Sequence, residues 1–193
     1  MPEGLRERTR RAVRAELAAI ALDLFAERGF EDTTVEEIAR AAGLTKRSFF
    51  RYFPAKEDAV FEGIDVTGDQ VVRDLLARPA DEAPWQSLRA VLSESERQIH
   101  ASGQAVAGLK LIESTPSLRA RVHEKRSRWR QQVSRALRDR PGADLDAFTA
   151  DLLTNAATAA LDTASQAWLR SDGTADRAAL LDRAFDLLQP TTA

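Results

Sequence analysis

Apolar residues recur every three or four positions along most of the chain, and the clearest case directly precedes Gly43. Val35 and Ile38 place apolar side chains on one face of a short helix. Thr34 stands before this helix and Glu37 follows three residues later, which is the spacing of a capping box. Gly43 tolerates the positive φ that ends a helix and turns the chain. The pattern therefore predicts a short, capped helix followed by a tight turn.

A second short helix is predicted directly after this turn, with Thr45 as its N-cap. Phe49 and Phe53 lie four residues apart, so both rings point to the same, inward side. Pro54 disfavours helix at the preceding residue and ends the segment. The outward positions are polar or basic: Lys46, Arg47, Ser48, Arg51 and Tyr52. Two short helices joined by a glycine turn, the second with a basic face, are typical of a helix-turn-helix, whose second helix enters a DNA major groove.

This segment resembles the TetR family of bacterial transcriptional repressors. The resemblance is carried by the run RYFPAKEDAV and by Phe25, Gly29, Thr33, Thr34, Val35, Ile38, Ala39, Ala42, Gly43, Phe49, Tyr52, Phe53 and Lys56. It covers roughly residues 15–61, and the rest of the chain agrees with the family only in length and all-helical character. The resemblance implies a homodimer that binds double-stranded operator DNA through the second short helix.

Carried over position by position, the resemblance implies base contacts from Lys46 and Arg47. Phosphate contacts are implied for Thr34, Ser48, Tyr52 and Lys56. Phe50 departs from the family, which usually has tyrosine there, so only an apolar contact, such as one to a thymine methyl group, is left to it. The full set of expected DNA-binding residues is Thr34, Thr45, Lys46, Arg47, Ser48, Phe50, Arg51, Tyr52 and Lys56.

The whole chain is predicted to be all-α, with about nine helices in two domains. Residues 1–55 form a three-helix DNA-binding domain that begins with a basic arm, over residues 1 to about 8, which either contacts DNA or forms a solvated tail. Residues 56–193 form a helical domain for ligand binding and dimerisation, beginning with one long helix over residues 56–78. Gly63 and Gly68 each lower the helix propensity of that segment by roughly 1 kcal/mol relative to alanine and are candidate positions for a bend.

The second domain contains all three tryptophans of the chain, on helices with broad apolar faces. Ordinary core packing is one interpretation of these faces, and an effector cavity between helices is the other. An apolar lining would favour a hydrophobic or amphipathic effector, of unknown identity. Asn155 either supplies a buried polar group or faces solvent. The expected ligand-binding residues are Leu92, Glu96, His100, Leu109, Trp129 and Asn155.

The last two predicted helices differ from the others in composition and in the width of their apolar faces. Residues 145–170 are rich in alanine, which lets helix axes approach closely, and the final helix has an apolar stripe broader than one neighbouring helix would cover. In the resembled family these helices form a four-helix bundle with a second subunit. The expected dimer-interface residues are Leu153, Ala157, Leu161, Leu181, Phe185 and Leu188.

Charge and composition add support without deciding the function. The net charge is −2, yet residues 1–56 carry +2 and the remainder −4, which suits a DNA-binding end on an acidic body. The chain has no cysteine and no apolar run of 18 residues, and its first residues are too charged for a signal peptide. We therefore expect a cytoplasmic protein with no membrane contact.

Motifs for catalysis and metal binding are absent from the sequence. There is no H-E-x-x-H, P-loop, G-x-S-x-G or G-x-G-x-x-G, and His100 and His123 are the only histidines. We expect no enzyme activity, no metal and no cofactor. The predicted function is a DNA-binding transcriptional regulator, most simply a repressor that an effector releases from its operator. The alternative is a helical small-molecule-binding or scaffold protein whose head does not read DNA.

Overall fold

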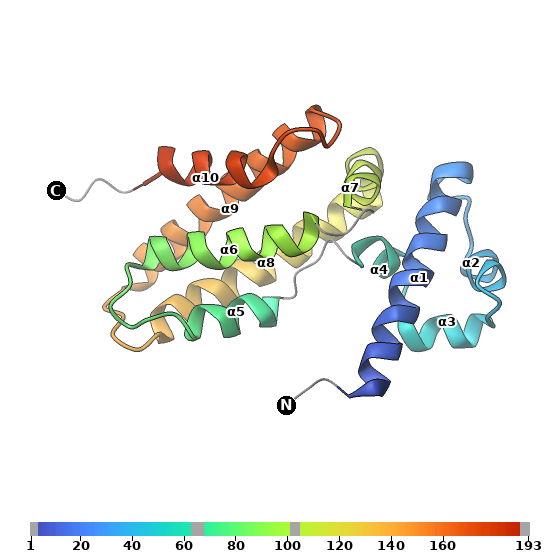
Figure 1. The fold of residues 1–193 in the computed structure, drawn as a ribbon, viewed down its shortest axis with the longest axis horizontal. Coiled ribbons are helices and arrows are strands. Elements are labelled where there is room, and N and C mark those ends of the chain that lie inside the picture. Colours follow the sequence, from blue (N-terminus) through green and yellow to red (C-terminus); the bar gives the residue numbers. More distant parts are fainter. Residues whose placement is uncertain (1–3, 63–67, 101–104, 190–193) are drawn as a thin grey trace. The chain divides into compact units, whose positions relative to one another are not determined.

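The computed structural model describes residues 4–62, 68–100 and 105–189, and these residues form ten α-helices and no strand (Figure 1). The predicted all-α fold is confirmed. The chain divides into two compact units, the first made of residues 1–65 and 102–119, the second of residues 66–101 and 120–193. None of the described helices combines the length and the apolar content that a membrane span needs.

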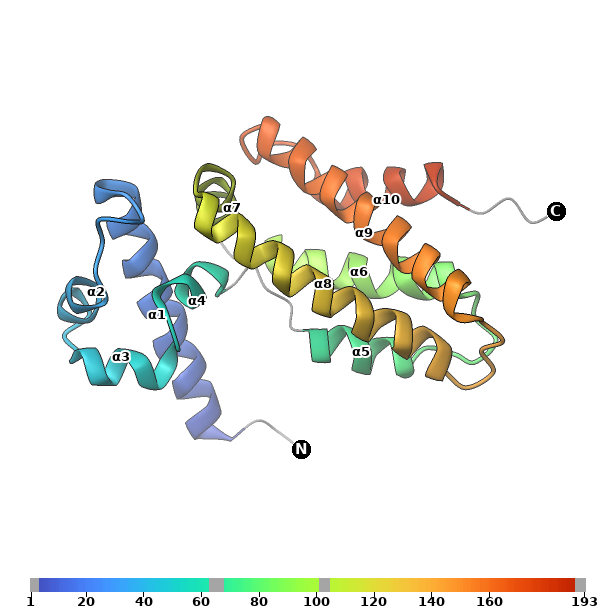
Figure 2. The ribbon, with the colours of Figure 1, turned by 180° about the vertical axis from the view of Figure 1, so that it is seen from behind.

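The first unit is built around the long helix α1 (Leu5–Arg28). Helices α2 (Val35–Ala41) and α3 (Lys46–Tyr52) lie on one side of α1 in both views (Figures 1 and 2), and α4 (Lys56–Phe61) packs along it. Helix α7 (Ala105–Ser114) contacts both α1 and α4. The core of this unit contains Leu17, Ala21, Phe25, Ile38, Phe49, Phe53 and Val60. The unit is therefore larger than the predicted domain of residues 1–55, because α4 and α7 pack with it.

The second unit is a helical bundle in two layers. Its helices are α5 (Gly68–Leu76), α6 (Pro84–His100), α8 (Pro116–Asp139, from Ala120 onward), α9 (Ala147–Arg170) and α10 (Arg177–Leu187). Helix α6 lies in front of α8 in Figure 1, and α8 lies in front of α6 in Figure 2. Helix α10 packs against α9 and α6. The shared core contains Leu75, Trp85, Leu88, Leu92, Val133, Leu137, Ala157, Leu181 and Phe185.

Two predictions about helix boundaries are wrong. The single helix expected over residues 56–78 is two helices, because α4 ends where Glu62 adopts an extended conformation, with φ −62° and ψ 130°, and α5 begins at Gly68. Gly63 lies outside the described residues. The expected basic arm over residues 1 to about 8 is also shorter than predicted, since α1 already begins at Leu5. The break between α4 and α5 accounts for ten helices where about nine were expected.

Candidate functional site

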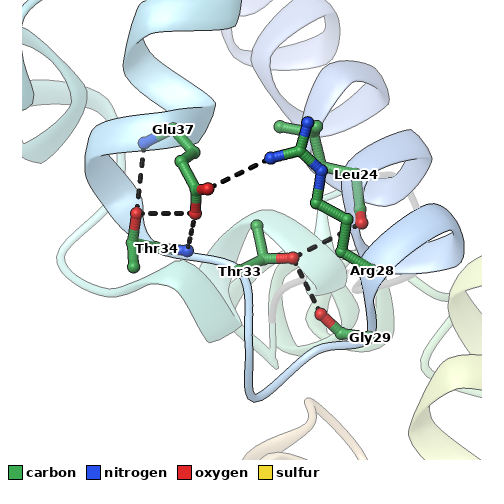
Figure 3. Close-up of polar contacts among 6 residues, drawn as sticks. All are labelled: Leu24, Arg28, Gly29, Thr33, Thr34 and Glu37. Carbon is green, nitrogen blue, oxygen red and sulfur yellow. Dashed lines mark hydrogen bonds and ion pairs between the residues drawn. The ribbon is translucent and has the colours of Figure 1, made fainter.

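The start of α2 is fixed by the hydroxyl groups of two threonines (Figure 3). Thr33 Oγ1 donates to the carbonyl of Gly29 at 2.7 Å and so ties the end of α1 to the segment that enters α2. Thr34 Oγ1 accepts from the backbone N–H of Glu37, and the Glu37 carboxylate accepts from the Thr34 N–H at 2.8 Å, which completes the predicted capping box. The Thr34 N–H is the main cause of the lowered pKa of Glu37. The local sequence thus sets the angle at which α2 leaves α1.

The turn between α2 and α3 forms as predicted. Gly43 has φ +67°, a value that glycine adopts without strain, and the N–H of Leu44 donates back to the Ala39 carbonyl at 2.8 Å. Thr45 caps α3 by accepting from the N–H of Ser48 at 3.1 Å. Phe49 is fully buried beneath α3. These bonds hold α3 against α2 in a fixed orientation.

The outer face of α3 carries the residues expected to meet DNA, but their surroundings differ. Lys46 forms an ion pair with Glu36 of α2, and this hydrogen bond is the main cause of the lowered pKa of Glu36. Arg51 donates to Tyr52 Oη at 3.3 Å. Arg47 is exposed, and the ring of Phe50 is 44% exposed. Arg47 and Phe50 are thus the two large side chains that α3 turns outward with no polar partner among the described residues.

Lys56 makes contacts that the sequence does not predict. Its ammonium donates to the carbonyls of Phe30 at 2.7 Å, Thr33 at 3.1 Å and Glu31 at 3.3 Å, and it lies 4.4 Å from the centre of the Phe30 ring. An ammonium has three N–H donors, so its hydrogen-bonding capacity is used within the protein. The side chain expected to hold a phosphate instead fastens the loop between α1 and α2 to the start of α4.

Arg14 is a second link that sequence reasoning missed. Its guanidinium donates to the Tyr52 carbonyl at the end of α3, at 2.6 Å, and to Glu62 at the end of α4, at 2.5 Å. It also lies 4.5 Å from the centre of the Phe53 ring. The sequence shows Arg14 only as one of several arginines near the start of the chain, since its partners are 38 and 48 residues away. Arg14 holds the ends of α3 and α4 against α1.

Known proteins match both parts of the chain. Residues 17–62 match the model of the bacterial regulatory proteins of the TetR family, and residues 71–193, more than half of the chain, match the model of the MftR C-terminal domain. The chain belongs to the TetR family. It is therefore a DNA-binding transcriptional regulator, as predicted, and release of DNA by a ligand is typical of this family.

Curated relatives and solved structures agree with this assignment. The regulator TcmR of Streptomyces glaucescens is 35% identical over 150 residues, which is 74% of this chain and 66% of TcmR, slightly less than two thirds of that protein. The regulator MftR of Mycobacterium tuberculosis is 29% identical, with 89% of this chain and 87% of MftR covered. The repressor NalD of Pseudomonas aeruginosa shares the fold, with a TM-score of 0.63 at 19% identity and 96% of each chain covered.

The residues expected to bind the effector of this TetR-family protein do not form one group. Leu92 is buried in the body core and Trp129 packs against that core. Leu109 lies on α7, which belongs to the first unit, and Asn155 is exposed on α9. The side chain of His100 lies outside the described residues. A polar surface groove along α6, lined by Arg78, Glu82, Gln86, Arg89, Ala90, Ser93, Glu94 and Arg97, includes none of the six.

Glu96, the remaining candidate, has a partner inside the body. It is 4% exposed and forms an ion pair with Arg177 of α10, which also donates to Ser165 Oγ at 3.0 Å. The guanidinium of Arg177 lies 4.9 Å from the centre of the Trp168 ring. Buried charges are costly unless they are paired, so Glu96 and Arg177 must stay together in the folded body. Their contacts therefore tie α6 to α9 and α10. No local pattern in the sequence predicts this ion pair, because its members are 81 residues apart.

The structure corrects the expected dimer interface. Ala157, Leu181 and Phe185 are fully buried within a single chain, and the Phe185 ring lies 4.7 Å from that of Trp85. They cannot meet a partner without opening the bundle. The physical reason is that α9 and α10 pack on each other and on α6, which uses one apolar face of each helix. Leu153 and Leu161 are half-buried, and Leu188 is exposed.

A different set of apolar side chains is turned outward on these helices. Phe148 and Leu152 of α9 are 75% and 56% exposed, and Leu187 of α10 is 77% exposed. Phe148 and Leu152 are one helical turn apart, with Asn155 next on the same face.

Within the described residues, no three His, Cys, Asp or Glu side chains gather closely enough to hold a metal ion.

Proposed function

We propose that this protein is a homodimeric repressor whose two α3 helices bind an operator, and whose body releases the DNA when it takes up an amphipathic effector. The observation that carries the DNA-binding part is the outer face of α3, where Arg47 and Phe50 project from a helix that is fixed by caps and a buried Phe49. Thr45, Ser48 and Tyr52 surround this pair and are proposed phosphate contacts. The repressor KstR2 of Rhodococcus jostii is 39% identical over 97 residues, which supports repression as the outcome.

Dimerisation is proposed through the outer faces of α9 and α10. Exposed aromatic and aliphatic side chains that cluster on adjacent helices mark interaction surfaces in soluble proteins. Phe148 and Leu152 in the first turns of α9, and Leu187 and Leu188 at the end of α10, are exposed on two helices that pack on each other. A second copy that presents the same surface would cover it by two-fold symmetry. Two head units are needed because each α3 reads half of an operator.

The proposed effector has an apolar part and an anionic part. The apolar interior of the body includes Leu92, which is buried in its core, and Trp129, which packs against that core. Helix α8 carries eight Lys and Arg residues against two Asp and Glu residues, in a body that is otherwise acidic. Such a concentration of positive charge favours anionic ligands. The solved regulator FadR of Bacillus subtilis, with a TM-score of 0.59 at 19% identity, is described in complex with stearoyl-CoA, a ligand with both properties.

Coupling between effector and DNA is proposed to run through the chain segments shared by the two units. The chain passes from one unit to the other near residues 65, 101 and 119. Helices α4 and α7 pack on α1 in the first unit. A displacement of the ends of α4 and α7 would therefore also move α1, the helix that carries Arg14. An effector that favours one placement of these helices shifts the population of DNA-binding dimers.

The effector proposal is tested by titrating stearoyl-CoA into the complex of the protein with its operator. DNA release is followed by fluorescence anisotropy, and ligand binding by tryptophan fluorescence. Free CoA and stearate are run separately, so that the anionic and apolar parts are distinguished. We expect the thioester to release DNA, and DNA to weaken thioester binding by the same factor. A thioester that binds the body and leaves operator affinity unchanged would contradict the coupling.

A further inference from the structure

The polar side chains of α3 divide into those that already have partners and one that does not. Lys46 is paired with Glu36. Ser48 and Thr45 bond to each other, with 3.0 Å between their hydroxyl oxygens. Arg47 is exposed and has no polar partner in the part of the chain that the structure describes. On this face, Arg47 is therefore the guanidinium that meets an incoming ligand without first giving up a bond.

Phe50 lies one turn further along α3. Packing within the fold does not account for the exposed part of its ring. Its ring is 44% exposed, although it meets the buried ring of Phe49 edge to face, with centroids 5.8 Å apart and planes at 86°. That contact fixes the direction in which the Phe50 ring projects. An anchored, half-exposed aromatic ring among charged neighbours has apolar surface available to a ligand, and the residues around it are basic.

We infer that Arg47 and Phe50 form the base-reading pair of this regulator, and that Phe50 recognises the C5-methyl group of a thymine beside a guanine read by Arg47. Arginine reads guanine through its O6 and N7 acceptors, and an apolar side chain reads thymine through its methyl group. Residues three apart on a helix rise by about 4.5 Å. Base pairs are stacked about 3.4 Å apart, so the two residues reach neighbouring pairs. This inference rests on the DNA-binding function and adds what the operator must contain.

The test begins with an operator that the protein itself selects from random duplex DNA. Each thymine of a half-site is then replaced by uracil, which pairs identically and lacks only the methyl group. At one position we expect the parent to lose about fourfold in affinity per half-site, the value of one buried methyl group. Phe50→Ala should bind thymine and uracil operators equally, whereas Phe50→Leu should keep part of the preference. Circular dichroism checks that both variants are folded.

A second substitution tests the neighbouring contact. Replacing the adjacent guanine by 7-deazaguanine removes the N7 acceptor and should weaken the parent by roughly fivefold or more. Arg47→Ala should be insensitive to this replacement. The two effects must fall on neighbouring base pairs, since the pair reads them from one turn of helix.

The outcomes separate this inference from the DNA-binding function on which it rests. A selected operator that binds tightly and tolerates uracil at every position overturns the role of Phe50 and leaves the regulator function intact. A uracil effect that persists in Phe50→Ala also overturns it, because another residue would then contact the methyl group. If no sequence is selected above random DNA, both the inference and the operator-binding function fail.

Discussion

Lys46, in the first turn of α3, forms an ion pair with Glu36 of α2. The residue expected to meet base edges is therefore held by the helix that precedes it. Replacing Glu36 with Gln frees the ammonium for a phosphate, so DNA binding should tighten by roughly 1.5- to 5-fold. The salt dependence should steepen by about one counterion per protomer. Anisotropy titrations over a range of salt concentrations measure both.

Glu27→Gln is the matched control for this substitution, because Glu27 is an exposed carboxylate of the same unit on α1. It removes the same charge without freeing Lys46. Equal salt slopes for Glu36→Gln and Glu27→Gln would mean that the pair does not restrain Lys46.

A substitution of Lys56 should change the stability of the fold and leave the salt dependence of DNA binding almost unchanged. Lys56→Met removes three charged hydrogen bonds to the α1–α2 loop and should lower the free energy of unfolding by roughly 2–3 kcal/mol. Its effect on the salt slope of DNA binding should be small. Arg135→Met, which removes an exposed charge from α8, serves as the control in thermal unfolding. Unchanged stability with a salt slope reduced by about one would instead assign Lys56 to a phosphate.

The outward faces of α9 and α10 are tested by changes that leave the core intact. Leu152→Asp combined with Leu187→Asp should give a folded monomer of 21.3 kDa by light scattering, with operator affinity reduced at least about 100-fold. Leu76→Asp, at an exposed leucine of α5, should remain dimeric. An unchanged dimer in the double variant would place the interface elsewhere. Phe185→Asp should instead unfold the body, because that ring is fully buried.

Glu82 makes the stability of the body depend on pH. Hydrogen bonds from Arg78, the main cause, and from Ser87 lower the pKa of its carboxyl group from 4.5 to about 2. The folded state therefore prefers the carboxylate, and its stabilisation is complete above pH 4.5 and lost as the pH falls toward 2. Glu82→Gln should cost roughly 1–2 kcal/mol at neutral pH and progressively less below pH 4.5.

Urea unfolding at several pH values measures this difference. Asp81→Asn, an exposed neighbour, is the control and should have little effect throughout. A cost of Glu82→Gln that stays constant from neutral pH down to about pH 2 would show that the ion pair does not stabilise the body.

The head could be predicted from the sequence because its signals are local. Thr34, Glu37, Gly43 and Thr45 act within a few residues of themselves, and the structure places all four as expected. Family resemblance added the function, which no local signal contains.

What could not be predicted depends on residues far apart in the chain. Local sequence does not predict that Glu96 forms an ion pair with Arg177, or that Arg14 forms one with Glu62. The faces of α9 and α10 show the same limit: both helices are apolar on more than one side, and only the packed structure shows that Phe185 is buried while Leu187 is exposed. Single-sequence periodicity finds an apolar face without naming what covers it.

The most direct test of the central claim is the salt-dependent affinity of the protein for its selected operator, compared with random duplex DNA of the same length. We predict operator binding at least about 1,000-fold tighter than random binding at physiological salt. Arg47→Ala should remove most of that preference, whereas Arg138→Ala, a control on α8, should keep it. Equal affinity of the parent for operator and random DNA, or an Arg47→Ala variant that retains full preference, would contradict the proposal that α3 reads an operator.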